Sequence, residues 1–293
     1  MDEAERLSIE LAAKISSGSP VPAMGQSELS APVLAYRKEI VVEQARSVEP
    51  LVRLDEEGVA AFSYYACDDH LNPPYYRQLA GSFKHVWCRK GVAEKLKAVN
   101  QALSQFRLEL LVLDGYRTIT CQQELLNRYL KLSKEHHPGF SQADTKQYAQ
   151  GSSPQLAPFD ETDPTTWPTH ITGGAVDLTL RTQSGAPVYM GGVFDDPSWV
   201  SCTSAYETLA ARLQQPEDAC SASHQEARDK RRMLYWAMTL AGFTNIPSEW
   251  WHYDWGNQQW YFRQCKAGEP PANKAWYGFI NPPREAQLPG HSC

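Results

Sequence analysis

Residues 170–180 read His-Ile-Thr-Gly-Gly-Ala-Val-Asp-Leu-Thr-Leu, with an imidazole and a carboxylate on the two sides of a glycine pair. On a straight strand, His170 and Asp177 would lie about 23 Å apart and on opposite faces. Both can reach one point only if the chain turns back between them, and Gly173-Gly174 permits the backbone angles of such a turn. The stretch therefore predicts a histidine on a loop, a glycine turn and an aspartate on the strand that follows.

Two further stretches place polar side chains beside predicted strands. An apolar run over residues 107–113 predicts a buried strand that ends at Asp114-Gly115, so Arg117 follows the exit of that strand. Glu249-Trp-Trp-His252 lies in an aromatic run that predicts a strand over residues 248–255. Residues three apart on a strand face opposite sides, so a bend or bulge must bring this carboxylate and imidazole together. Four aromatic residues are expected to wall the site: Trp250, Trp251, Tyr253 and Trp255.

The three stretches combine into one chemical set: two imidazoles, two carboxylates beside them and an arginine. A hydrolytic zinc centre needs three protein ligands, an open position for water, a general base and a cation for the developing oxyanion. The set matches these needs. The remaining histidines lack partners at ligand spacing and are predicted to lie on the surface or in hydrogen bonds: His70, His85, His136, His137, His224 and His291.

The rest of the chain predicts helices joined by polar loops. Helical spacing of apolar residues predicts helices over 2–16, 91–106, 120–134 and 224–241. Residues 138–168 form a long polar loop, and the tail after about residue 264 is rich in proline and expected to be irregular. We expect residues 1–47 to be an extension, a helix plus linker, that packs on a catalytic domain spanning 48–293.

Bulk composition excludes several classes of protein. The 293 residues suffice for one large domain or two small ones, and a net charge of −6 gives no footprint for nucleic acid. No apolar run reaches the length of a membrane span. The acidic N-terminus does not read as a secretory signal, so we expect a cytoplasmic protein, or a periplasmic one if a leader precedes this sequence. Seven widely spaced cysteines predict free thiols.

The combination of motifs from about Glu49 to Phe262 resembles the zinc-dependent D-alanyl-D-alanine dipeptidases of the VanX type. Further stretches carry this resemblance: Tyr64-Tyr65-Ala66, Met190-Gly-Gly-Val-Phe-Asp195, Arg231-Arg232-Met-Leu and Ala241-Gly-Phe243. The resemblance implies an α+β fold with a small, mostly antiparallel sheet and packed helices, shared with D,D-carboxypeptidases and the Hedgehog signalling domain. It also implies a small dipeptide as substrate.

Carried over position by position, the resemblance implies one Zn²⁺ per chain and a role for each site residue. The zinc ligands would be His170, Asp177 and His252. Glu249 would activate the zinc-bound water, and Arg117 would stabilise the oxyanion. For the substrate's free ammonium, the resemblance implies Asp195 as the acceptor and Tyr65 as its helper.

Three positions depart from the family pattern: Thr118 replaces proline, Pro168 replaces a substrate-binding serine, and Thr172 replaces arginine. Two alternative functions remain open. One is a zinc D,D-carboxypeptidase acting on peptidoglycan stem peptides, against which Asp195 argues. The other is a non-catalytic, zinc-containing binding module, against which Glu249 and Arg117 argue. The sequence does not determine the oligomeric state.

Overall fold

The apolar run near residue 110 forms β3 (Leu108–Asp114), an edge strand of a four-stranded sheet. The computed structural model describes residues 1–23, 35–145, 159–209, 221–266 and 274–284. The sheet order is β3, β4 (Ala175–Thr182), β6 (His252–Asp254) and β5 (Thr244–Asn245), and each strand is antiparallel to its neighbour. A second antiparallel pair consists of β1 (Leu51–Arg53) and β2 (Trp87–Arg89). The predicted α+β class with a small, mostly antiparallel sheet is confirmed.

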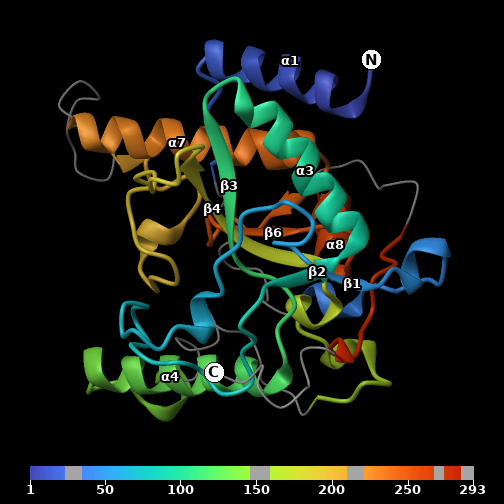
Figure 1. Ribbon diagram of the computed structural model, residues 1–293. Coiled ribbons are helices and arrows are strands. Elements are labelled where there is room, and N and C mark those ends of the chain that lie inside the picture. The colour runs from blue at the N-terminus through green and yellow to red at the C-terminus, as the bar shows by residue number, and fades with distance from the viewer. Residues whose placement is uncertain (24–34, 146–158, 210–220, 267–273, 285–293) are drawn as a thin grey trace.

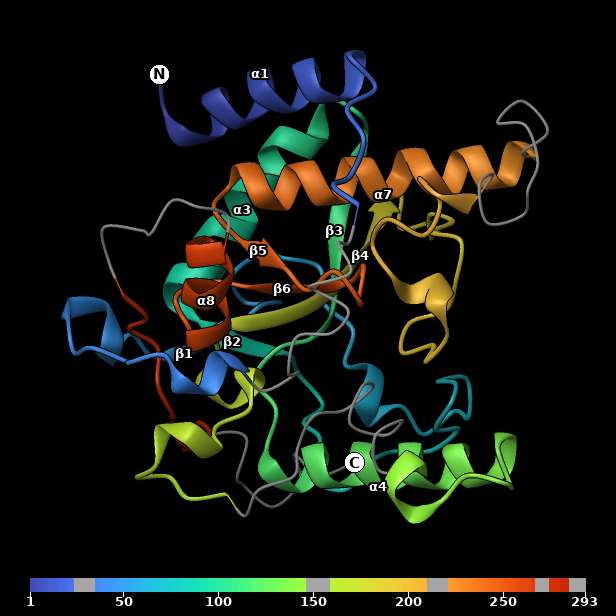
Figure 2. The same cartoon turned by 180° about the vertical axis from the view of Figure 1, so that it is seen from behind.

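Helices lie at two ends of the molecule (Figure 1). At one end, α1 (Glu3–Ser16) packs on both α3 (Lys90–Ser104) and α7 (Ala222–Leu240). At the other end lies α4 (Ile119–His136), and α8 (Gln258–Lys266) packs beside β5 (Figure 2). All four predicted helices are present, and each begins and ends within two residues of its prediction.

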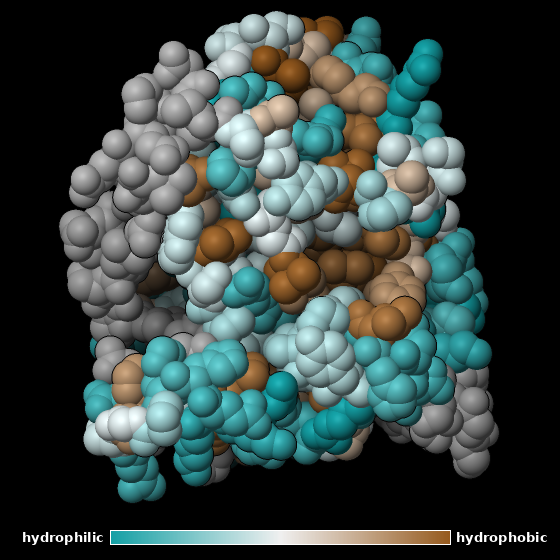
Figure 3. Space-filling model, turned by 90° about the vertical axis from the view of Figure 1, so that its left-hand side faces the viewer, coloured by the Kyte–Doolittle hydropathy of each residue, from teal (hydrophilic) through white to brown (hydrophobic). Residues whose placement is uncertain are grey.

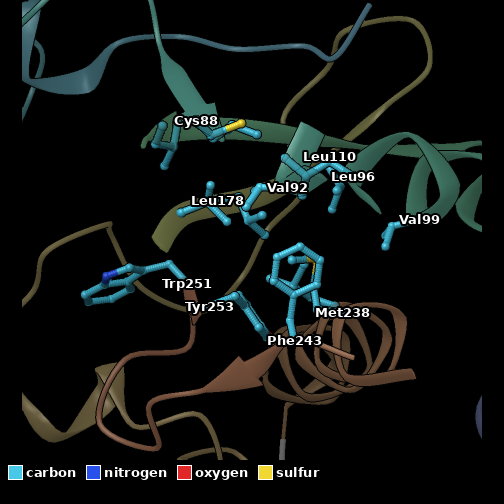
Figure 4. Close-up of a cluster of buried hydrophobic side chains, with 14 of the residues drawn as sticks. Cys88, Val92, Leu96, Val99, Leu110, Leu178, Met238, Phe243, Trp251 and Tyr253 are labelled. Atoms are coloured by element: carbon cyan, nitrogen blue, oxygen red, sulfur yellow. The ribbon is translucent and has the colours of Figure 1, made fainter. Parts of the chain in front are cut away.

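The main core lies between the sheet and the α3–α7 pair. Apolar residues of α3 recur at helical spacing and therefore share one face, which packs against side chains from the strands. Figure 4 shows this cluster, in which side chains from α3, from the sheet and from the end of α7 point toward one another. Its buried members include Val92, Leu96, Val99, Leu110, Leu178, Met238, Phe243 and Tyr253.

The described part of the N-terminal extension shares this core. Leu7 and Leu11 of α1 are fully buried in the same cluster as the strands. Two short 3₁₀ turns follow, η1 (Ala35–Lys38) and η2 (Ala45–Val48), and Val41 forms a bridge with Ala275 near the other end of the chain. The described part of the extension therefore packs against the rest of the chain.

The predicted strand over residues 248–255 is wrong in its first half. Only His252–Asp254 forms a strand, β6, and the preceding residues form a turn. The Glu249 amide donates to the Ile246 carbonyl at 2.9 Å, and the Trp250 amide donates to the Ser201 carbonyl at 2.9 Å. These two backbone amides therefore form their hydrogen bonds outside the β-sheet. The aromatic character of this stretch reflects burial in the core, since Trp250 and Trp251 are both buried there.

Two other features bear on the sequence predictions. The helix α8 was not predicted, and it extends two residues past the point where an irregular tail was expected. The cysteines that the structure describes are all free: Cys67, Cys88, Cys121, Cys202 and Cys265. The other two, Cys220 and Cys293, lie outside the described residues. Within the described ranges, no helix has the length and apolar character that a membrane crossing requires.

Candidate metal centre and substrate pocket

Three predicted ligands converge at one point at the end of the sheet. Asp177 on β4 and His252 on β6 are direct cross-strand partners, so the register of the sheet places them side by side. His170 lies in η5 (Thr169–Thr172), directly before the glycine turn, and Gly173 takes a φ of +69°. The predicted order of loop, glycine turn and strand is confirmed. A Cβ at Gly173 would lie 2.5 Å from the Leu51 side chain, which would have to move, so glycine is favoured here mainly by its positive φ.

The three donor groups lie close enough together to share one metal ion. His170 Nε2 lies 3.3 Å from His252 Nδ1 and 3.4 Å from Asp177 Oδ2. His252 Nδ1 lies 2.9 Å from Asp177 Oδ1. Tetrahedral donors at zinc-like bond lengths are separated by roughly 3.3–3.6 Å, a range that includes both distances from His170 but not the shorter distance between His252 and Asp177. The three side chains are buried and fit a metal ion of that size.

Hydrogen bonds behind the imidazoles orient them toward the metal position. His170 Nδ1 lies 2.7 Å from the Gly115 carbonyl oxygen, which can only accept, so Nδ1 carries the hydrogen and Nε2 presents its lone pair. His252 Nε2 lies 3.0 Å from Asp254 Oδ2, and this contact directs Nδ1 to the same centre. Carboxylate and carbonyl partners of this kind fix the tautomer of ligating histidines. Burial alone would raise the pKa of Asp177, but the two imidazoles lower it below its ordinary value.

Arg117 lies where the sequence predicted, between the exit of β3 and the start of α4. Thr118, which departs from the family pattern, accepts a hydrogen bond from the Cys121 amide and caps α4. The guanidinium donates to Asp114 at 2.8 Å and to Asp177 at 3.0 Å. Burial alone would lower the pKa of Arg117, but the Tyr65 hydroxyl and the two carboxylates raise it well above the ordinary value. A fixed positive charge therefore lies against the metal ligands.

Glu249 lies in the turn before β6 and not on the strand. The strand rule that would point it away from His252, three residues later, therefore does not apply. Its Oε2 lies 3.9 Å from His252 Nδ1, and its side chain is 22% exposed. Burial raises the pKa of Glu249 to about 8, and the charges of Asp177 and Asp195 act in the same direction. The carboxyl group faces the pocket with a proton affinity suited to exchange near neutral pH.

Asp195 forms a second anionic centre, held by tyrosines. The hydroxyls of Tyr65 and Tyr75 each donate to Asp195 Oδ2 at 2.7 Å, and the Tyr129 hydroxyl donates to its backbone carbonyl at 2.8 Å. The residue has a φ of +61°, a conformation that aspartate and asparagine tolerate better than most side chains. Burial raises the pKa of Asp195 to about 7, and the nearby charge of Asp177 adds to this rise.

The segment that carries Asp195 is anchored to α7 by a buried arginine. Arg231 Nε donates to the Met190 carbonyl at 2.8 Å, and Nη1 donates to the carbonyls of Val200 at 2.7 Å and Cys202 at 2.8 Å. The two ends of the segment therefore meet at one guanidinium. Figure 3 looks onto the face that carries this segment, where hydrophobic side chains lie among hydrophilic ones. Three large hydrophobic residues in this segment or directly before it are exposed: Tyr189, Val193 and Trp199.

These groups line one partly open pocket of about 520 Å³. Every predicted site residue contributes to it. The predicted aromatic wall is wrong: Trp250, Trp251, Tyr253 and Trp255 pack in the core, and tyrosines form the wall instead. Of the three departures, Pro168 lines the pocket, whereas the buried Thr172 side chain donates to the Thr169 carbonyl and lies outside it.

Sequence reasoning missed several pocket residues and one supporting residue. Tyr75, Gln122 and Tyr129 reach the pocket through long-range packing and carry no local signal. Asp254 did carry a local sequence signal. Residues two apart on a strand share a face, and His252-x-Asp254 follows this pattern.

Known proteins are similar to this chain in sequence. Residues 56–267 match the family described as D-ala-D-ala dipeptidase. The D-alanyl-D-alanine dipeptidase of Synechocystis sp. is 28% identical over 240 residues, which are 79% of this chain and 92% of that protein. The D-alanyl-D-alanine dipeptidase of Escherichia coli is 26% identical over 191 residues, 65% of this chain and 75% of that protein.

A solved structure is also similar: the vancomycin-resistance D,D-pentapeptidase VanY in complex with Zn(II). The TM-score is 0.36 and the identity 15%, with 78% of this chain and 94% of that chain covered. The family match rests on the sequence, and it spans most of the chain. The protein therefore belongs to the D-Ala-D-Ala dipeptidase family and is a hydrolase of the metallopeptidase class.

Proposed function

We propose that this chain hydrolyses D-Ala-D-Ala, or a closely related D-configured dipeptide, with one zinc ion held by His170, Asp177 and His252. The observation that carries the proposal is the convergence of three oriented metal donors with a second carboxylate and a charged arginine in one pocket. The names of the two relatives support the choice of substrate.

Zinc suits the donor set. Two imidazole nitrogens and one carboxylate oxygen are common ligands of catalytic zinc sites, which keep an open fourth position. When bound, zinc supplies an acidified water and polarises the scissile carbonyl. The hydrogen bonds that the imidazoles donate to the Gly115 carbonyl and the Asp254 carboxylate keep the imidazole lone pairs directed at the ion position.

Glu249 is the group placed to move protons. Its carboxyl group lies 3.9 Å from a ligand atom, so it borders the position that a nucleophilic water would occupy. A carboxylate with a raised pKa accepts the proton of that water and later gives it to the leaving amine. Arg117 lies against Asp177 and can donate to the oxyanion of the tetrahedral intermediate, where fixed charge contributes strongly to the rate.

Asp195 selects substrates with a free amino terminus. It lies in the same pocket as the metal ligands and has tyrosine donors on one oxygen, Oδ2. An ammonium group satisfies the charge of this buried carboxylate. A longer stem peptide brings an amide in place of that ammonium and leaves the carboxylate uncompensated, which is costly. The pocket therefore favours a dipeptidase over a carboxypeptidase.

The test is the release of D-alanine from D-Ala-D-Ala by metal-free protein, before and after addition of zinc. We expect release only with zinc, and much slower release from a tetrapeptide or pentapeptide stem. The control is a D,D-, L,D- and D,L-dipeptide panel with the zinc content measured on the same sample. No hydrolysis across that panel by protein shown to contain zinc would refute the proposal.

A further inference from the structure

A dipeptide carries opposite charges at its two ends, and the pocket accounts for only one of them. Asp195 suits the ammonium. Three of the pocket tyrosines are already engaged there, since Tyr65 and Tyr75 donate to the carboxylate and Tyr129 donates to its backbone carbonyl. The inference that follows rests on the proposed function and concerns the carboxylate at the other end of the same substrate.

The fourth tyrosine of the described pocket wall comes from outside the family match. Tyr36 lies in η1, twenty residues before the matched region begins at residue 56, and it lines the pocket together with Pro168 and Thr169. Its ring is 4% exposed, so its position is fixed by packing. The hydroxyl lies 3.3 Å from the Trp167 carbonyl, directly beside the pocket-lining Pro168.

Tyr36 and Asp195 approach the pocket beside different metal ligands. The His252 ring faces Asp177 through Nδ1 and Asp254 through Nε2. Hydrogen bonds connect Asp195 through Tyr65 and Arg117 to Asp177, whereas the Tyr36 hydroxyl contacts Trp167, three residues before His170. A dipeptide whose scissile carbonyl lies at the metal would thus direct its ammonium to Asp195 and its carboxylate toward Tyr36.

The positively charged side chain of Arg37 contacts the Tyr36 hydroxyl. Arg37 is 5% exposed, and its Nε donates to the Tyr36 hydroxyl at 3.3 Å. A hydrogen bond donated to the oxygen of a phenol polarises the hydroxyl group, so the phenol donates its own hydrogen more readily. Both contacts of the hydroxyl are long for hydrogen bonds of this type, so a carboxylate offers a shorter, charge-assisted alternative to the Trp167 carbonyl.

We propose that the Tyr36 hydroxyl, which accepts a hydrogen bond from Arg37, binds the C-terminal carboxylate of the dipeptide. Pro168 has no amide hydrogen and no side-chain donor, so it cannot donate a hydrogen bond to the carboxylate on this side of the pocket. The N-terminal extension thereby completes the substrate pocket in addition to packing on the core.

The test compares D-Ala-D-Ala with D-alanyl-D-alaninamide, which keeps the ammonium and lacks the carboxylate. Both are assayed with zinc-loaded wild type and Tyr36→Phe, as substrates and, for the amide, as a competitive inhibitor. Loss of one hydrogen bond to a charged group lowers kcat/KM for the acid by about 10- to 100-fold. The amide constants stay near their wild-type values. The matched control is Tyr76→Phe, at a tyrosine that is 54% exposed.

The outcomes separate the two proposals. If wild type with bound zinc releases no D-alanine, the proposed function fails. If wild type is active but does not prefer the acid over the amide, the carboxylate assignment fails without any variant. Equal loss on both substrates in Tyr36→Phe, or loss on neither, also overturns it. Phenylalanine retains the buried ring, and the unfolding temperature of the variant verifies that the fold is kept.

Discussion

Asp195→Asn is expected to make the protein more stable and less active at the same time. The substitution keeps the shape of the side chain, and asparagine tolerates the φ of +61° at this position. The remaining amide oxygen can still accept from Tyr65 and Tyr75, which both donate to one carboxylate oxygen in the wild type. What disappears is the buried negative charge.

The expected stability gain follows from the raised pKa. Burial raises the pKa of Asp195 from 3.8 to about 7, so the folded state binds this proton more tightly than the unfolded chain. The stability of the wild type therefore falls as pH rises from about 4 to about 7, by at most about 4 kcal/mol. Asparagine does not ionise, so the variant avoids this loss, and its unfolding temperature at pH 8 rises by roughly 5–10 °C.

The activity changes in the opposite direction. Removal of one partner of a buried charge pair costs several kcal/mol, so kcat/KM for D-Ala-D-Ala falls about 10²- to 10³-fold. Calorimetry of the metal-free proteins at pH 4 and pH 8 and steady-state kinetics of the zinc-loaded proteins measure both effects. A variant no more stable than wild type at pH 8, or one with unchanged kcat/KM, would show that Asp195 is not a strained, ammonium-binding carboxylate.

Three further substitutions test the metal centre. Glu249→Ala keeps the zinc content but lowers kcat by about 10²- to 10⁴-fold, and loss of metal from this variant would contradict its role as a base. His252→Ala removes one of three ligands, so zinc is lost on dialysis, as elemental analysis will show; retained zinc would place the site elsewhere. Asp254→Asn weakens zinc affinity about 10- to 100-fold in a chelator competition, because the hydrogen bond that orients His252 is altered, and an unchanged affinity would argue against that support.

Local patterns in the sequence predicted most of the fold. The helices follow from apolar spacing, and β4 follows from its glycine turn, because these signals act over a few residues. The turn at Glu249 could not be predicted in the same way. Its tryptophans look like strand residues, yet they are buried by contacts with distant segments such as Phe194.

The clustering of the three candidate metal donors was predictable, whereas the pocket wall was not. His170, Asp177 and His252 stand in motifs whose combination is chemically specific. Tyr75 and Tyr36 enter the pocket from segments with no such motif, and only the packing of distant parts of the chain brings them there. Residue type alone does not distinguish them from other tyrosines.

The anchoring of both ends of one segment at Arg231 has a consequence for protein engineering. Met190 at one end and Val200 and Cys202 at the other are fixed to a single helix, so residues 191–199 between them form a cassette with fixed ends. Its exposed positions, Val193 and Trp199, can be varied while the buried Phe194 keeps its contact with Trp251 beside the strand that carries His252. A library confined to this cassette would redirect recognition of the amino end of the substrate and leave the hydrolytic machinery unchanged.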